Sequence, residues 1–447
     1  MNTFSLDHLR GLSVWALWAI SIFANAQSLA TVQTNNIHAL EIRNEIKNEI
    51  SLESAIKHML ANAPERHEFT FKQKALEGEG KTASLKPALN AAIEIENVLG
   101  TGELSGIKNA ELTLSLSSVI ELGDKIRVRA AVVNAKSTLL EAQKRVNTLD
   151  LLAEVTRRYI DVLAQQALLE IQKQAETLAR HTYQAVTKRV NAGASHVFEQ
   201  KRASSALARA QLEVLTAQQS KQSMINSLAI MWGEQSPTFT QVTGDLFALP
   251  PSPSLTVLFA NVLASENLTV YAQESRVQQA QARLIQTANE ADLTWTAGIR
   301  RINGINDSAF VAGLSMPLFS GERNLGEFQQ QKALIGQLEQ QKQAATLNFY
   351  HQLNMALLAR NNALLNVQTL QSAIIPPLEE ALVLVEQAYI DGRFSYVEWI
   401  STRQELLNAK QMLIQAAKQA HQRGADIESL TAQPLVNTLN SSLSSHK

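Results

Sequence analysis

The hydrophobic positions of the chain recur mainly with the period of an α-helix, and the longest such stretch, between Gly123 and Gly193, contains no Gly or Pro. Either residue is unfavourable in a helix interior, by about 1 kcal/mol for Gly and 3 kcal/mol for Pro. The spacing therefore predicts one continuous helix over 124–191, about 100 Å long. Small alanines are scattered among its apolar residues, which favours packing against neighbours on two sides. A rod of this length is typical of a coiled coil, a helical repeat or a tube.

Two regions alternate with period two, and this pattern predicts β-hairpins over 88–118 and 293–318. In the run 111–117, for example, the apolar residues occupy the even positions. Strands of about 9 to 11 residues can cross a bilayer when they are tilted. Half-buried strands of soluble proteins alternate in the same way, so the pattern alone leaves both environments open.

The chain contains an internal duplication. Residues 119–125 match 317–323 at an offset of 198, and residues 189–199 match 388–398 at an offset of 199. Two matches that keep the same spacing over so long a helix indicate a repeated structural unit. The second copy is interrupted by Pro376 and Pro377, which predict a kink close to its tip.

This duplication gives the expected domain organisation. A signal peptide over 1–26 precedes a first repeat over 27–232, with a helix, the hairpin 88–118, the long helix 124–191 and a helix over 195–231. A linker over 233–254 leads to a second repeat over 255–423, with a helix, the hairpin 293–318, a long helix over 322–391 and a helix over 394–423. A Ser-rich tail over 424–447 is expected to be poorly ordered.

The first residues have the pattern of an export signal. Arg10 precedes an apolar run that ends at Phe23, and small residues follow up to Ala26. This pattern predicts a secretory signal peptide cleaved after Ala26, with an uncleaved anchor as the alternative. We expect no membrane-spanning helix in the rest of the chain. Such an exported chain fits the periplasm or the outer membrane of a Gram-negative cell.

Composition narrows the range of functions. The net charge of −1 and the aromatic content of 5% provide no basic, stacking surface for nucleic acid. The chain has no Cys, and its nine His are scattered without an HxxxH or HxH pair, so we predict no metal site and no cofactor. Neither a Ser/His/Asp set, a paired acid nor a phosphate loop occurs at a usable spacing, so no catalytic residue is predicted and an enzyme is a distant alternative.

The four predicted strands are too few to close a membrane barrel. Every backbone polar group within a bilayer must be paired, and single-chain barrels begin at about eight strands. If the hairpins cross a bilayer, several copies of the chain must combine. The obvious assembly is a ring of identical subunits that share one barrel, which their long helices continue as a tube.

Three features of the sequence carry a family resemblance: the duplicated order, the starts of the long helices and the second tip. The quoted segments are Gly123-Asp124-Lys125, Gly321-Glu322-Arg323 and the run from Ala388 to Trp399. Together they resemble the TolC-family outer-membrane efflux channels. Glu96-Asn97 before a Gly-rich loop, and 114–116 leading into 120–123, are similar to the CzcC-like heavy-metal cation subgroup.

The resemblance implies a mainly α fold with a membrane β-barrel, in which duplicated helix/β-hairpin/long-helix units form a homotrimer. Its trimeric 12-stranded outer-membrane barrel would contact outer-membrane lipid and continue as a periplasmic α-helical tunnel. An equatorial collar would come from segments near 27–50, 232–254 and 424–447. The implied function is passive conduction of solutes, with divalent heavy-metal cations expected. These would pass from an inner-membrane resistance-nodulation-division pump, through a periplasmic adaptor protein, to the exterior.

Gly193 and Gly392 are expected at the periplasmic tips of the helices. Gly just after a helix permits the left-handed conformation that ends it, and this structural role alone explains both glycines. Their position at exposed tips also makes them candidates for adaptor docking. Arg393, Phe394 and Tyr396 are further docking candidates, because a simple turn does not require them.

The resemblance also implies acidic residues around a closed aperture just beyond the second tip. Glu398 occupies one such position, and the next candidate, one helical turn on, is Ser401. A trimer would then carry one carboxylate per chain in this ring, which could gate the channel and select cations. A solvated helix face is the alternative interpretation of Glu398.

Glu94, Glu96 and Glu111 share the polar parity of the first hairpin. A barrel would therefore place three carboxylates from each chain in its lumen, offset in part by Arg300 or Arg301. Our hypothesis is a cation-preferring pore. The alternative is that any water-filled barrel has a polar interior, whatever it conducts.

A periplasmic coiled-coil adaptor (membrane fusion) protein is the alternative function. Such an adaptor is expected to contain one helical hairpin flanked by Gly- and Val-rich β-domains. This chain instead shows two helical hairpins and no such block, which favours the channel.

Overall fold

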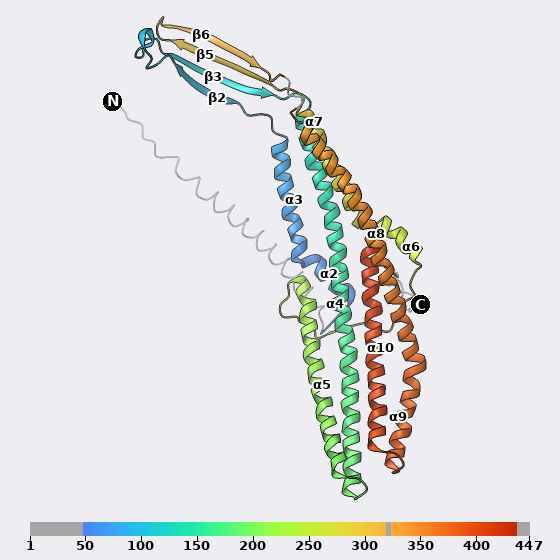
Figure 1. Ribbon diagram of the computed structural model, residues 1–447. Helices are drawn as coiled ribbons and strands as arrows, with labels where there is room; N and C mark the ends of the chain where they lie inside the picture. Colours follow the sequence, from blue (N-terminus) through green and yellow to red (C-terminus); the bar gives the residue numbers. More distant parts are fainter. Residues whose placement is uncertain (1–47, 319–322, 436–447) are drawn as a thin grey trace, which may run out of the picture.

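The computed structural model describes residues 48–318 and 323–435, which form an elongated molecule with a four-stranded sheet at one end and long helices along the rest (Figure 1). The helices are α2 (Leu52–Asn62), α3 (Pro64–Ala83), α4 (Lys125–Asn191), α5 (Val197–Ala229), α6 (Leu255–Leu263), α7 (Glu266–Thr287), α8 (Leu325–Thr369), α9 (Ile375–Ile390) and α10 (Tyr396–Thr431). The strands are β1 (Glu49–Ile50), β2 (Asn90–Glu96), β3 (Glu111–Ile120), β4 (Gln241–Val242), β5 (Leu293–Ile302) and β6 (Asp307–Ser315).

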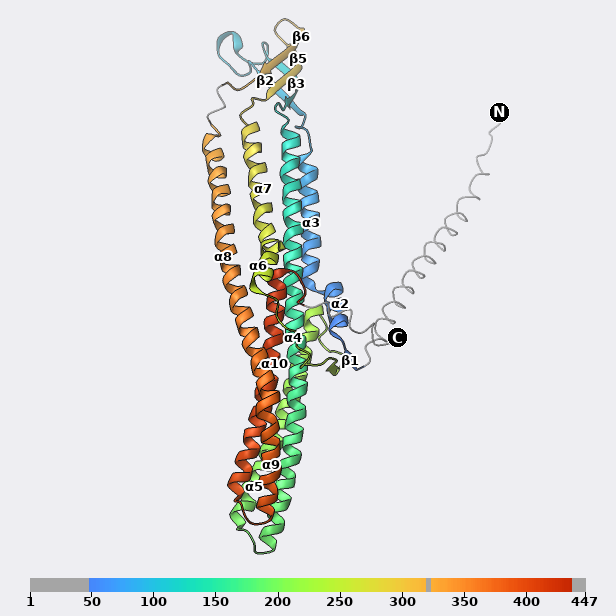
Figure 2. The ribbon, with the colours of Figure 1, turned by 90° about the vertical axis from the view of Figure 1, so that its right-hand side faces the viewer.

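The long helix predicted over 124–191 is α4, and it runs from the sheet to the opposite tip (Figure 2). It begins after Gly123 and Asp124, which both have positive φ values, of 75° and 60°. Along its length α4 packs against α3, α5, α7 and α10. Neighbours on several sides explain why its apolar residues and alanines are spread around the helix.

The two predicted hairpins join into one antiparallel sheet, with the order β2-β3-β5-β6. The central pairing is between β3 and β5, which come from different repeats. It is very close at Gly298, where an added Cβ would lie 2.5 Å from the carbonyl oxygen of Leu114. We therefore expect that any side chain at position 298 would push the two hairpins apart.

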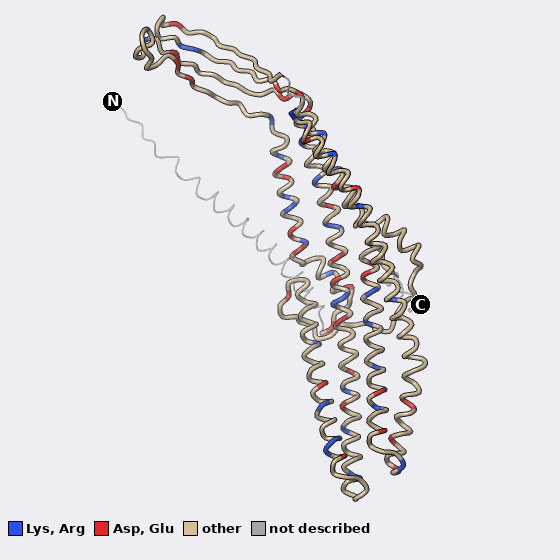
Figure 3. Tube along the Cα trace, in the orientation of Figure 1, with Lys and Arg blue, Asp and Glu red and all other residues tan. Residues whose placement is uncertain are grey.

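The two faces of the sheet differ in polarity. The register aligns Ile93, Leu114, Ile299 and Phe310 across the four strands, so one face is apolar. Its exposed apolar side chains are Ile93, Ile95, Leu112, Leu114, Leu116, Ile299, Phe310 and Leu314. The charged residues lie toward the turn end of the sheet and at its junction with the helices, with an uncharged stretch between them (Figure 3).

A second, two-stranded parallel sheet lies near the middle of the molecule, where β1 pairs with β4. The buried Tyr159 of α4 ties these strands together, because its hydroxyl contacts the carbonyl oxygens of Ile50, at 3.1 Å, and Thr243. The surrounding core includes Trp232 and Phe239, whose ring centroids are 6.0 Å apart. The region after the first repeat is thus anchored to the long helix.

Several element boundaries differ from the sequence expectation. The last helix, α10, continues to Thr431 instead of ending at 423. Gly424 does not stop it: an added Cβ there would lie 3.4 Å from Leu435 and 3.5 Å from Arg360, so this glycine allows close packing inside the helix. The predicted signal peptide over 1–26 and the end of the tail, 436–447, lie outside the described residues.

The second repeat is less regular than the first. The expected start of its long helix at 322 lies outside the described residues, and α8 begins at Leu325. Just before Pro376 and Pro377, a π-helical segment over Leu370–Ile374 separates α8 from α9. The prolines cannot donate the backbone hydrogen bonds of a regular α-helix, which accounts for an interruption at this position.

One stretch of the described residues has the length and composition of a membrane-spanning helix, which the sequence interpretation did not anticipate. The stretch Leu255–Thr287 passes a test of length and composition, because an 18-residue window within it has a mean hydropathy of 1.2. The fold divides this stretch, because α6 ends at Leu263 and α7 begins at Glu266. The two helices then pack against α8 along the helical part of the molecule.

Candidate functional site

The three predicted carboxylates of the first hairpin lie on one face of the sheet. Glu96 is directly opposite Glu111 in the register, and Glu94 is opposite Thr113. The counter-charge comes from Arg300 on β5, which lies on the same face. Its guanidinium group is 2.9 Å from a carboxylate oxygen of Glu96 and 3.0 Å from one of Glu111.

The three carboxylates therefore differ in whether they form an ion pair with Arg300. Its Nε also donates to the hydroxyl of Thr113, at 3.0 Å, which fixes the side chain along the face. Glu94 is exposed and forms no ion pair within residues 48–318 and 323–435. Arg301, the other candidate, belongs to the opposite face and contacts Asn306. One Arg300 faces both Glu96 and Glu111, so this face keeps a net negative charge, to which the unpaired Glu94 contributes.

The predicted helix ends at Gly193 and Gly392 are confirmed. Both glycines have left-handed backbones, with φ of 72° and 79°. The amide of Gly193 donates to the carbonyl of Val190 at 3.0 Å, and that of Gly392 to the carbonyl of Tyr389 at 3.0 Å. These bonds satisfy carbonyl groups at the ends of α4 and α9.

The tip surface is apolar, and it does not include all the predicted docking residues. Exposed apolar side chains of the two tips are Val197, Phe198, Ile390, Phe394 and Val397. Arg393 also lies here, paired with Asp391 at 2.5 Å. Tyr396, in contrast, is only 3% exposed, so its inclusion among the surface candidates is corrected. It packs against Tyr389 in the core between the helical pairs, with ring centroids 6.4 Å apart.

A polar link between the two tips was not apparent from the sequence. Arg189 of α4 donates to the carbonyl oxygens of Tyr389, at 2.6 Å, and Ile390, at 2.8 Å, at the end of α9. The hydroxyl of Tyr389 in turn donates to the carboxylate of Glu199 on α5, at 3.2 Å. Arg189 and Tyr389 are separated by 200 residues, and helical periodicity cannot show that two such residues meet.

Glu398 has a structural role at the start of α10. Ser395 is the N-cap, and its hydroxyl accepts a hydrogen bond from the Glu398 amide at 3.4 Å. The Glu398 carboxylate accepts one from the Ser395 amide at 2.8 Å, which completes a capping box. This backbone hydrogen bond lowers the pKa of the Glu398 carboxyl, so the side chain stays ionised at neutral pH.

A second carboxylate on α10, Glu405, was missed. Glu398, Ser401 and Glu405 are all exposed, and their spacing of three and four residues places them along one side of the helix. The hydroxyl of Ser401 is 3.5 Å from Glu405. The signal was present in the sequence, since Glu405 is two helical turns beyond Glu398. No group of three or more His, Asp or Glu residues is placed to hold a metal ion in the described parts of the chain.

Comparison with known proteins matches this architecture. Residues 82–234 match the family described as outer membrane efflux protein. The cobalt-zinc-cadmium resistance protein CzcC of Cupriavidus metallidurans is 25% identical over 316 residues, which are 71% of this chain and 76% of that relative.

Two solved structures share the fold. CusC, described as forming a transmembrane channel, superposes with a TM-score of 0.70 at 16% identity and covers 85% of this chain and 91% of its own. The outer membrane protein VceC of Vibrio cholerae superposes with a TM-score of 0.68 at 18% identity and covers 86% and 97%.

Paired long helices that continue into an antiparallel sheet with one apolar face thus define an outer-membrane channel subunit. The outer membrane efflux protein family model matches residues 82–234 of the chain, and the chain is an efflux channel of the outer membrane that extends into the periplasm. This family is one of channels, and the match covers the first hairpin, α4 and α5. The periplasmic adaptor, the alternative from the sequence, receives no support.

Proposed function

We propose that three copies of the chain close a shared 12-stranded barrel. The observation that carries this proposal is the sheet order β2-β3-β5-β6, in which β2 and β6 are the outer strands of the described sheet. In a bilayer their backbone groups need partners, which neighbouring copies can provide by pairing β6 with β2. The exposed apolar face then contacts lipid, and the face with Arg300 and the carboxylates lines the lumen.

The mass of the detergent-extracted protein tests this assembly. Native mass spectrometry of protein extracted from the outer membrane should give about three times the mass of the mature chain. Substituting Gly298 by Val should weaken the trimer, because the β3–β5 pairing inside each chain has no room for a side chain. Val at Gly313, where an added Cβ meets nothing within 4 Å, is the matched control. A soluble monomer would contradict the proposal.

The transported solutes are proposed to be divalent heavy-metal cations. The relative CzcC is described as a cobalt-zinc-cadmium resistance protein, which supports this class of solute. The lumen face supports it as well, because each chain contributes the free carboxylate of Glu94. We further propose that the solutes arrive from a resistance-nodulation-division pump through an adaptor, in line with the efflux family. Gly193, Gly392, Arg393 and Phe394 lie on the surface proposed to dock the adaptor.

Two carboxylates of α10 are proposed to face the aperture at the periplasmic end. Glu398 and Glu405 are seven residues apart, or about 10 Å along the helix. A trimer would therefore have two acidic rings where the sequence indicated one, with the hydroxyl of Ser401 between them. Acidic rings of this kind favour cations over anions.

The ion selectivity of the channel should depend on Glu94. In planar bilayers with a KCl gradient, Glu94→Lys should shift the reversal potential toward anion permeation, because it replaces the free charge of the lumen face. Glu96→Gln should have a smaller effect, because it changes the charge of the lumen face by one unit instead of two and Glu96 is paired with Arg300. Glu77→Lys on α3, away from the sheet, makes the same charge change as a control. Equal reversal potentials for Glu94→Lys and the control would reject a selective lumen.

A further inference from the structure

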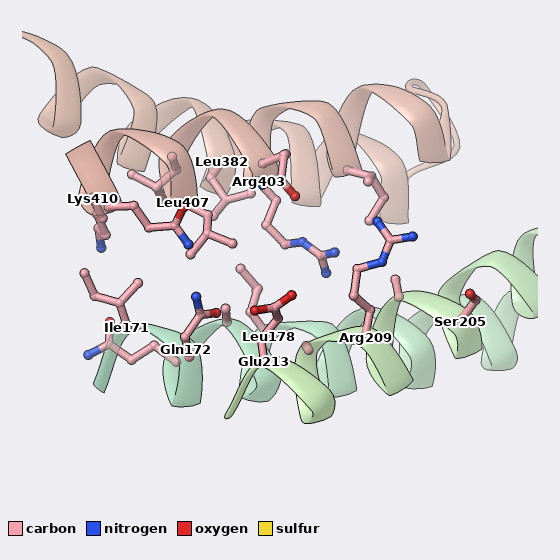
Figure 4. Close-up of a pocket in the computed structure, with 18 of the residues that line it drawn as sticks. Ile171, Gln172, Leu178, Ser205, Arg209, Glu213, Leu382, Arg403, Leu407 and Lys410 are labelled. Carbon is pink, nitrogen blue, oxygen red and sulfur yellow. The ribbon is translucent and has the colours of Figure 1, made fainter. Parts of the chain in front are cut away.

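A cavity of about 900 Å³ lies between the two helical pairs, well away from the sheet. Its walls come from α4 and α5 on one side and from α9 and α10 on the other (Figure 4). Leu178 and Leu382 contribute apolar surface from opposite sides, and Arg209 and Arg403 project into the space between the pairs. The size is within the range of small-molecule sites, roughly 300–1,000 Å³.

The cavity has an excess of cationic side chains. Arg202, Arg209, Arg403 and Lys410 line it, against only two acidic residues, Glu213 and Glu379. Lys410 and Glu379 form an ion pair with each other at 2.6 Å, so their charges cancel. The three arginines form no ion pair with any carboxylate in the parts of the chain that the structure describes.

The positive charges of Arg403 and Arg209 are the least compensated by neighbouring groups. The only hydrogen bond of the Arg403 guanidinium within the described residues is a long one, 3.5 Å, to the hydroxyl of Thr182. Burial lowers the pKa of Arg403, which shows that its charge is partly removed from water without an acidic partner. Arg202 lies over the ring of Tyr396, 5.6 Å from its centroid, whereas Arg209 is exposed toward the cavity.

We propose that this cavity binds a small organic anion. Guanidinium groups present several N–H donors in a plane, which matches a carboxylate, sulfonate or phosphate group. The acidic group of the ligand would lie between Arg209 and Arg403, and its apolar part would pack against Leu178 and Leu382. The site is separate from the proposed cation path, because Arg403 lines the cavity whereas Glu398 is exposed elsewhere on α10.

A ligand in this cavity would connect the two helical pairs. Arg209 belongs to α5 and Arg403 to α10, so an anion held by both connects the two helical pairs. The direct polar links at the tip, through Arg189 and Tyr389, join the same pairs further along. Binding should therefore raise the thermal stability of the helical part as well as fill the cavity.

The test uses 1-naphthalenesulfonate as the probe and the full chain in nanodiscs of zwitterionic lipid. Isothermal titration calorimetry should show saturable binding, weakened by about tenfold or more in Arg209→Gln and in Arg403→Gln, because each loses a charge-assisted hydrogen bond. Lys201→Gln removes one positive charge from the same helix outside the cavity and should bind like the unsubstituted protein. The uncharged 1-naphthalenemethanol should not bind saturably.

Three outcomes would overturn the proposal. The unsubstituted protein could fail to bind the probe, as expected if Glu213 or a neighbouring copy fills the site. Both arginine variants could bind it as tightly as Lys201→Gln. The neutral analogue could bind as well as the sulfonate, which would reduce the site to an apolar one. If Arg403→Gln does not fold, Arg209→Gln decides, because Arg209 is exposed.

Discussion

Replacing Arg360 by alanine is expected to lower the free energy of unfolding by about 3 kcal/mol. Arg360 lies on α8 and is only 2% exposed. Its guanidinium group donates to the carbonyl oxygen of Pro250, at 2.7 Å, and to the hydroxyl of Ser252. It therefore holds the linker after the first repeat against the helices of the second. Alanine would leave these acceptors without a partner and create a cavity.

The nearby charge of Glu428 makes the loss of stability in this variant larger. Burial lowers the pKa of Arg360 and raises that of Glu428, and the two opposite charges partly offset each other. Without Arg360, the half-buried Glu428 carboxylate would lose that compensation, although it would keep the hydrogen bond from the Leu435 amide at 2.8 Å. A carboxyl pKa raised above its ordinary value of 4.5 in the folded state means that stability is lost as the pH rises from that value through the raised pKa, so the destabilisation of the variant should grow over that interval and stay constant above it.

Differential scanning fluorimetry of the purified protein, repeated at several pH values, measures this effect. Arg423→Ala is the matched control, because Arg423 is another arginine of this region but is 46% exposed and pairs with Asp426 on its own helix, at 3.0 Å. Such a pair contributes about 1 kcal/mol at most. If Arg360→Ala melted no lower than Arg423→Ala, the linker would not depend on this contact.

The succession of helices and strands along the chain was the part of the fold that the sequence could predict. The absence of Gly and Pro from 124–191 reports directly on helix continuity, and α4 lies where this pattern indicated. The alternation in 111–117 likewise identified β3. Both signals are local, because each residue restricts its own backbone. The pairing of β3 with β5 connects residues 173 to 191 positions apart, and no local pattern encodes that register.

The candidate site was less predictable, because its residues depend on tertiary contacts. A tyrosine four residues after the tip glycine Gly392 resembles a surface contact, yet Tyr396 turns into the core beside Trp399 and Tyr389. Gly424 suggested a helix end, but it lies within α10 where Arg360 approaches closely. Parity did place Glu94, Glu96 and Glu111 on one face. It could not show which of them would form ion pairs with Arg300.

Arg189→Ala combined with Tyr389→Phe is expected to open the periplasmic tip and increase the single-channel conductance in planar bilayers. The two substitutions remove the Arg189 bonds to α9 and the Tyr389 bond to Glu199, while Phe keeps the aromatic packing. Each lost hydrogen bond lowers the cost of separating the pairs by about 0.5–1.5 kcal/mol. Three of them should raise the population of separated tips by at least about tenfold.

The control for this experiment is Arg180→Ala. Arg180 is on the same helix as Arg189, but its ion pair is with Glu176 on α4 itself, at 2.5 Å, so its loss does not touch α9. If the tip bounds the aperture, the double variant should conduct most, Arg189→Ala alone should conduct less than the double variant but more than the control, and Arg180→Ala should conduct like the unsubstituted protein. Equal conductance in all three variants would mean that the pore is limited elsewhere, with the acidic rings of Glu398 and Glu405 as the next constriction to substitute.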